Sequence, residues 1–314
     1  MAERRPADGW VVLMLVYTAT IWGANVVMLK VMASHFPAVQ LAAVRTVVAF
    51  AFIALIARVI GVRPRKVSPR ELAILAAAAF LMIYAHQIFL TQGLAWSTAT
   101  NGGLALSLNP LLSVFLGALL FGERLSKVGL IGVVLGFAGA AIVILNRTGA
   151  ELALHGAGDA LLILSMLVYV AAGAFMRRLA GRVGAIHISW YMHLLGGAML
   201  VAHAALLPET WTMELWRAPA NAWVLIAVSG LFSTAMGGIG WSYGIAWLGL
   251  GRTAVFLNLL PLSALAAAVL FLGETVLPIH LAGFFLVLSG TWLAGRGKVN
   301  AISIEVKREQ RPAN

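Results

Sequence analysis

The sequence predicts an all-α polytopic membrane protein whose ten transmembrane helices form two inverted five-helix repeats. Three observations support this prediction: the composition, a series of long apolar runs, and an internal duplication. Of the 314 residues, 61% are hydrophobic and only 11% are charged. A soluble domain carries about 45–50% apolar and about 25% charged residues, so the composition argues against a soluble enzyme or a nucleic-acid-binding protein.

Ten apolar runs are long enough to cross a bilayer, because a hydrocarbon core of about 30 Å needs roughly 20 apolar residues in a helix. The segments that join the runs are short, so neighbouring helices are antiparallel. The first run is too long for the apolar core of a signal peptide, and we expect it to be retained. The expected spans are 10–32, 38–60, 71–93, 99–121, 127–146, 157–179, 185–207, 221–245, 252–272 and 277–295.

Basic residues are unevenly distributed between the two ends of the spans. The chain has 22 Lys and Arg against 11 Asp and Glu, for a net charge of +11. If the N-terminus is cytoplasmic, every Lys and Arg falls on the cytoplasmic side except Lys30, Arg147, Arg217 and the intramembrane Arg45. The positive-inside rule therefore places both termini in the cytoplasm. The polar segment 296–314 is expected to be a disordered cytoplasmic tail.

The two halves of the chain carry the same motifs in the same order. Pro110 and Pro261 lie 151 positions apart, as do Glu123 and Glu274 (274 − 123 = 151). Each repeat holds five helices, and an odd number forces the second copy to enter the membrane from the opposite side. We expect a first repeat over 1–149 and a second over 150–295. The alignment also pairs Gly132 with Gly283, Gly139 with Gly290, Trp22 with Tyr169, Lys30 with Arg177 and Pro37 with Ala185.

The motifs resemble those of the ten-helix EamA-type members of the drug/metabolite transporter superfamily, over about residues 10–295. The resemblance is carried by Trp22-Gly23, Lys30, Arg45, Pro110 with Gly122-Glu123, and Pro261 with Gly273-Glu274. It implies a bacterial inner (plasma) membrane protein with a central cavity lined mainly by helices 1, 3, 4, 6, 8 and 9. It also implies export of amino acids or other metabolites, with bacterial aromatic amino-acid exporters as the nearest relatives.

Polar and aromatic side chains inside the spans are the candidates for a substrate site. Asn25 and Gln87 come first, because an amide can bind a carboxylate or an ammonium group. Tyr84, Gln87 and Thr91 follow i, i+3, i+7 spacing and should share one helix face. Each candidate could instead pack between helices. The expected substrate-binding residues are Tyr17, Trp22, Asn25, Tyr84, His86, Gln87, Asn101, Tyr169, Ser233, Trp241 and Asn258.

Charged residues in the spans are few. Arg45 lies mid-way through a span, where it pairs with carbonyl groups, a lipid phosphate or a substrate carboxylate. Lys30 lies near a helix end, where its ammonium can reach the membrane surface, and Glu123 and Glu274 are expected to anchor turns. No Asp or Glu lies at the centre of a span. The protein should therefore work as a facilitator, unless His86 takes up the proton.

These observations predict a secondary transporter that exports small metabolites, neutral or aromatic amino acids first among them, by alternating access. The alternatives are a multidrug or other metabolite efflux carrier and a channel-like facilitator. The chain has no cysteine and no His-x3-His or His–carboxylate spacing, so neither a catalytic role nor a metal or cofactor is expected. The expected partners are a small-molecule substrate and the lipid bilayer, with no nucleic acid and no need for an oligomer.

Overall fold

A computed structural model of the chain describes residues 8–62, 65–121, 126–145, 150–179, 182–207, 217–248, 253 and 256–296, and in these ranges it contains helices and turns but no strand. Two segments, η1 and η2, are π-helical, and η3 is a 3₁₀ turn. The helical segments are α1 (Asp8–Ala33), α2 (Ala38–Val59), α3 (Pro69–Ala79), η1 (Phe80–Ala85), α4 (His86–Trp96), α5 (Ala99–Ser107), α6 (Asn109–Phe121), α7 (Lys127–Leu145), α8 (Ala150–Leu179), α9 (Ala185–Leu206), α11 (Ala220–Val228), η2 (Ser229–Met236), α12 (Gly237–Leu248), η3 (Phe256–Asn258), α14 (Leu259–Leu272) and α15 (Pro278–Arg296).

The helices follow the expected spans closely. Three of the spans are composite: α3–η1–α4, α5–α6 and α11–η2–α12. The largest difference is at α8, which begins at Ala150 rather than near 157. Its first turns are rich in Ala and Leu, whose high helix propensity extends the helix beyond the apolar run. Glu123 and the predicted tail beyond Arg296 lie outside the described residues.

The outer surface of the bundle is apolar, as expected in lipid. Six described segments are at least 18 residues long and apolar enough to cross a membrane, and three shorter helices are also apolar. Leu119 of α6 is 67% exposed, and Leu270 and Phe271 of α14 are each 76% exposed. In water such large apolar surfaces would favour aggregation, whereas a bilayer solvates them.

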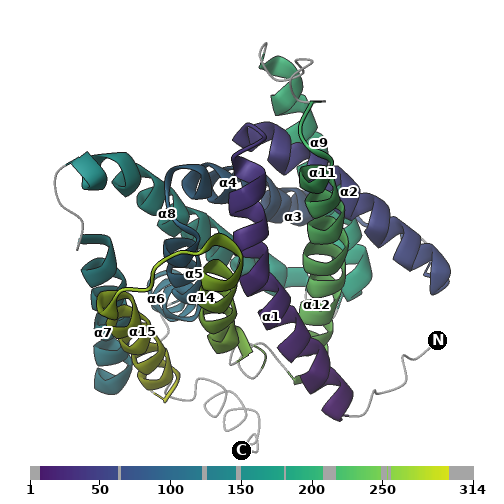
Figure 1. Cartoon of the computed structure of the whole chain (residues 1–314). Helices are drawn as coiled ribbons and strands as arrows, with labels where there is room; N and C mark the ends of the chain where they lie inside the picture. The colour runs from purple at the N-terminus through teal and green to yellow at the C-terminus, as the bar shows by residue number, and fades with distance from the viewer. Residues whose placement is uncertain are drawn as a thin grey trace, which may run out of the picture.

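The helices α7 and α15 pack along each other at one side of the bundle (Figure 1). Glycines allow the close approach: a methyl group on Gly132 would lie 2.6 Å from the carbonyl oxygen of Gly290, and one on Gly139 would lie 2.8 Å from that of Gly283. In the sequence alignment, Gly132 is equivalent to Gly283 and Gly139 to Gly290. Each glycine therefore faces the equivalent of the other, which is the contact pattern of an antiparallel pair related by a two-fold axis.

A second pair of contacts repeats the same symmetry. The rings of His86 and Tyr169 lie 5.0 Å apart between α4 and α8. Their equivalents in the other repeat are Gly237 and Trp22, and a methyl group on Gly237 would lie 2.6 Å from Nε1 of Trp22. The two repeats are thus inverted copies. In Figure 1, α1 runs between α14 on one side and α12 on the other.

Candidate substrate site

A polar cluster around Arg45 joins α1, α2, α4 and η2. The side chain of Arg45 is only 3% exposed. Its Nη1 donates to Oγ1 of Thr234 at 3.1 Å and more weakly to Oγ of Ser229 at 3.5 Å, and its Nη2 donates to Oε1 of Gln87. Ser229 in turn donates to Oδ1 of Asn25 at 2.5 Å. The two amides that the sequence ranks first, Asn25 and Gln87, are therefore brought together through a buried guanidinium.

Two π-helical segments position this cluster. η1 ends at Ala85, two residues before Gln87, and η2 contains Ser229 and Thr234. Under the 151-residue repeat, residues 80–85 correspond to 231–236, so both repeats carry the irregularity at the same depth. π-helical turns bond i to i+5 rather than i+4, and they occur frequently at functional sites.

Aromatic side chains of α1 bind the carbonyl groups of η2. The hydroxyl of Tyr17 donates to the carbonyl oxygen of Phe232 at 2.8 Å, and Nε1 of Trp22 donates to that of Ser233 at 2.9 Å. The ring of Trp22 also lies 5.6 Å from that of Trp241 on α12. Four of the predicted residues therefore meet at the contact of α1 with η2 and α12.

His86 of α4 and Tyr169 of α8 form the contact that is related to this one by the symmetry of the two repeats. Nδ1 of His86 lies 3.0 Å from the carbonyl oxygen of Ser165 on α8. Because a carbonyl can only accept, Nδ1 carries the proton of the neutral ring. His86 directly precedes Gln87, whose side chain accepts from Arg45, so this contact adjoins the Arg45 cluster.

The structure places three other predicted residues elsewhere. Tyr84 turns towards α9, where its hydroxyl lies 3.0 Å from Nδ1 of His203, so it does not share a face with Gln87. Asn101 donates to Oδ1 of Asp159 at 2.9 Å in the N-terminal third of α8. Asn258 is half-buried at the start of α14 and does not cap that helix with its side chain.

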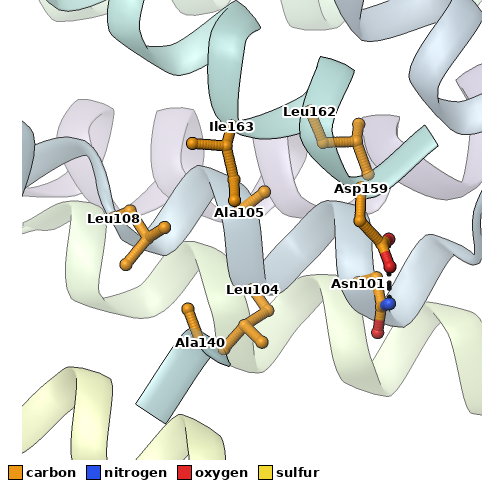
Figure 2. A pocket seen from close by; sticks show the side chains of 8 residues that line it. All are labelled: Asn101, Leu104, Ala105, Leu108, Ala140, Asp159, Leu162 and Ile163. Atoms are coloured by element: carbon orange, nitrogen blue, oxygen red, sulfur yellow. Dashed lines mark hydrogen bonds between the residues drawn. The ribbon is translucent and has the colours of Figure 1, made fainter. Parts of the chain in front are cut away.

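Asp159 is a buried carboxylate that the sequence reasoning missed. It is 2% exposed and also accepts a hydrogen bond from Oγ of Ser97. With Asn101 and six aliphatic residues it lines a cavity of about 10 Å³, room for a single water molecule (Figure 2). Asp159 lies only two positions inside the predicted span 157–179, away from its centre. The expectation of a facilitator rests on span centres without Asp or Glu, a criterion that does not detect this buried carboxylate.

Charged side chains also hold the turn between α4 and α5. The ammonium group of Lys30 does not reach for the membrane surface: it donates to the carbonyl oxygens of Leu94, at 2.8 Å, and Ser97 at the end of α4. Glu274 anchors the start of α5 rather than its own turn, and accepts from the backbone nitrogens of Ala99 at 2.8 Å and Thr100 at 2.9 Å. Both contacts place the charge where the helix dipole favours it.

The described residues contain no group of three His, Asp or Glu side chains that could hold a metal ion. The Arg45 cluster instead offers hydrogen-bond donors and acceptors beside indole and phenol rings. Such an arrangement suits non-covalent binding of a small polar molecule.

Comparison with known proteins identifies the family. The model of the EamA-like transporter family matches residues 9–145 and 156–296. The chain is 27% identical over 284 residues to a probable terminal-alkyne amino-acid exporter of Streptantibioticus cattleyicolor, covering 90% of this chain and 92% of that protein. It is 26% identical over 326 residues to a probable amino-acid metabolite efflux pump of Salmonella typhimurium, covering 97% and 98%.

A solved crystal structure has the same fold, with a TM-score of 0.65 at 18% identity over 92% of this chain and 98% of that one. These matches indicate a transporter rather than an enzyme. The chain belongs to the EamA-like transporter family.

Proposed function

We propose that this protein exports small metabolites, above all neutral and aromatic amino acids, by alternating access. The observation that carries the proposal is the polar cluster of Asn25, Arg45 and Gln87, which is enclosed by helices of both inverted repeats. Transporters of this architecture bind their substrate near the bilayer midplane, where the repeats meet, and rock around it.

The aromatic residues beside the cluster support an amino-acid substrate with an apolar side chain. Trp22, Trp241 and Tyr17 would pack against the side chain or ring of the substrate, while Asn25 and Gln87 would bind its charged groups. The two relatives whose names state a cargo are an amino-acid exporter and an amino-acid metabolite efflux pump.

We assign the predicted residues to the site by their contacts. Ser233, His86 and Tyr169 complete the wall of the site, because they lie at the two symmetry-related contacts that flank Arg45. Asn258, half-buried at the start of α14, stays a proposed substrate contact from that helix. Tyr84 and Asn101 are left outside, since their polar groups bind His203 and Asp159.

The proposed topology follows from the charge distribution. The protein would lie in the bacterial plasma membrane with both termini in the cytoplasm, and residues 1–149 and 150–295 would move as the two repeats. Substrate would then leave the cell at the end of the bundle that carries Lys30.

The test is release of labelled compounds from liposomes that contain the purified protein. We expect labelled phenylalanine and leucine to leave faster than from empty liposomes, and glucose and the cationic dye ethidium to leave no faster. Release of glucose or ethidium without release of either amino acid would reject the substrate class in favour of another metabolite or drug.

The proposed site is tested by replacing its amides. In Asn25→Ala and Gln87→Ala, transport should weaken by the value of a hydrogen bond to a charged group, about 1.5–3 kcal/mol or roughly 10- to 150-fold. Thermal stability should also fall, by about 1–3 kcal/mol, because Gln87 accepts from the buried Arg45 and Asn25 from the buried Ser229. If both variants are stable and transport at the normal rate, the substrate site does not include these amides.

A further inference from the structure

The geometry points to Arg45 as the residue that binds the carboxylate group of the transported substrate, an inference that rests on the proposed function of amino-acid export. The guanidinium of Arg45 is buried and donates to neutral side chains of two helical segments, α4 and η2. Four properties of this arrangement support the assignment: its unpaired charge, its position, its free donor and its selectivity.

The charge of Arg45 is not balanced by a described acidic residue. The one ion pair within 4 Å in the described ranges joins Arg65 to Glu71, at 3.7 Å and near the start of α3. A charged side chain at the centre of a membrane helix is costly to insert when no opposite charge accompanies it. Neutral hydrogen bonds recover only part of that cost, whereas a bound carboxylate would supply the opposite charge.

Arg45 also lies near the symmetry axis of the molecule. Its equivalent in the second repeat is His193, because 193 − 45 = 148 is also the spacing of Pro37 and Ala185. The helices that carry Arg45 and His193, α2 and α9, pack against each other, and a methyl group on Gly197, one turn after His193, would lie 3.4 Å from Cγ2 of Thr46, the neighbour of Arg45. A residue close to its own equivalent lies close to the axis that relates the repeats. In inverted repeats that axis lies in the membrane plane, where a substrate can be reached from each side in turn.

One edge of the Arg45 guanidinium is almost free to bind a substrate. Nε and Nη2 carry parallel N–H groups on the same edge of the guanidinium, which match the two oxygens of a carboxylate. Nε is buried and has no hydrogen-bond partner within the described residues, and Nη2 is bound to the amide oxygen of Gln87. Displacement of that one neutral amide would open the edge for bidentate binding.

The same charge determines which molecules the site accepts. A carboxylate is attracted to the guanidinium, whereas an organic cation of the same shape is repelled in this low-dielectric environment. Oδ1 of Asn25 is an acceptor in the same cluster and can receive an N–H from the ammonium group of an amino acid. The site should therefore select zwitterions and carboxylates over amines and amides.

The experiment compares four compounds of one shape in liposomes that contain the purified protein. Transport of labelled phenylalanine is measured against unlabelled phenylalanine, 3-phenylpropanoate, phenylalaninamide and phenethylamine. We expect the first two, which carry a carboxylate, to compete, and the other two to need concentrations at least about 10-fold higher. Equal competition by all four compounds would overturn the inference.

Variants connect this selectivity to Arg45. In Arg45→Gln, the apparent affinity for phenylalanine should fall about 10- to 150-fold while that for phenylalaninamide does not, so the ratio of the two affinities falls towards one. Arg45→Lys should retain part of the preference, because it keeps the charge and loses the planar pair of donors. Arg178→Gln is the matched control, since that arginine is exposed on α8 and packs over Phe175.

The outcomes separate this inference from the proposed function. If the unaltered protein moves none of the compounds, the proposed function and the inference both fail. If it moves phenylalanine and Arg45→Gln keeps the full preference for the carboxylate, the function stands and Arg45 is not the carboxylate-binding residue. If Arg45→Gln does not fold, Arg45→Lys decides: an unchanged ratio of the two affinities in that variant overturns the inference.

Discussion

Gly23 brings α1 so close to α14 that no side chain fits between them. In Gly23→Ala, the new methyl group would lie 2.5 Å from the carbonyl oxygen of Leu260 and 2.8 Å from the nitrogen of Ala264, and it would also overlap Oγ of Ser263. Two of these three atoms belong to the backbone, so α14 must shift as a unit. Overpacking of this kind costs about 1–3 kcal/mol, while alanine regains up to about 1 kcal/mol of helix propensity. We expect a net loss of about 1–2 kcal/mol.

The assay is thermal unfolding in detergent, with Gly173→Ala as the matched control. Gly173 lies in α8, and a methyl group there would meet no atom within 4 Å. This control keeps the gain in helix propensity without the clash, so its melting temperature should rise or stay the same while that of Gly23→Ala falls. If Gly23→Ala is as stable as Gly173→Ala, α1 does not pack against α14 as closely as described above.

Three further variants test individual contacts. Glu274→Gln should lower the free energy of unfolding by about 1–2 kcal/mol in thermal melts, because it removes the charge that binds the first nitrogens of α5; an unchanged melt would contradict this contact. Asp159→Asn should lower stability and leave downhill transport of phenylalanine intact. If a pH gradient drives accumulation of phenylalanine by the unaltered protein but not by this variant, Asp159 is instead a residue that couples transport to protons. Tyr84→Phe should transport normally because its hydroxyl binds His203, and a tenfold loss would place Tyr84 in the site.

The sequence predicts the helices well because their limits are set by local signals. The apolar runs give spans within a few residues of the observed ones. The duplication aligns Gly132 with Gly283 and Gly139 with Gly290, but the packing of each against the equivalent of the other is seen only in the structure. The start of α8 departs from prediction, since hydropathy marks where a helix enters lipid and not where it begins. Helix propensity favours the additional turns, and the contact of His155 Nδ1 with the carbonyl oxygen of Trp96, at 2.6 Å, ties them to the end of α4.

The site is harder to predict, because its contacts join helices far apart in the chain. The i, i+3 spacing of Tyr84 and Gln87 predicts a shared face only if the helix is regular, and the π-helical turn η1 rotates Tyr84 away. Arg45 stands out in the sequence, but its partners lie 42 and 184 or more positions away and follow from helix packing. Asp159 does not stand out in the sequence, because it lies near the end of a span. Its burial comes from the neighbouring helix α5, which the sequence does not place beside it.

Counterflow tests most directly whether the two repeats alternate around one site. Liposomes that contain the protein are loaded with unlabelled phenylalanine and diluted into a trace of labelled phenylalanine. A carrier whose site faces one side at a time will draw the label transiently to a concentration above the outside, and the overshoot will saturate with substrate. The account predicts this overshoot, and its reduction in Arg45→Gln. Monotonic equilibration of the label without an overshoot, at a rate that does not saturate, would show a pore and contradict alternating access.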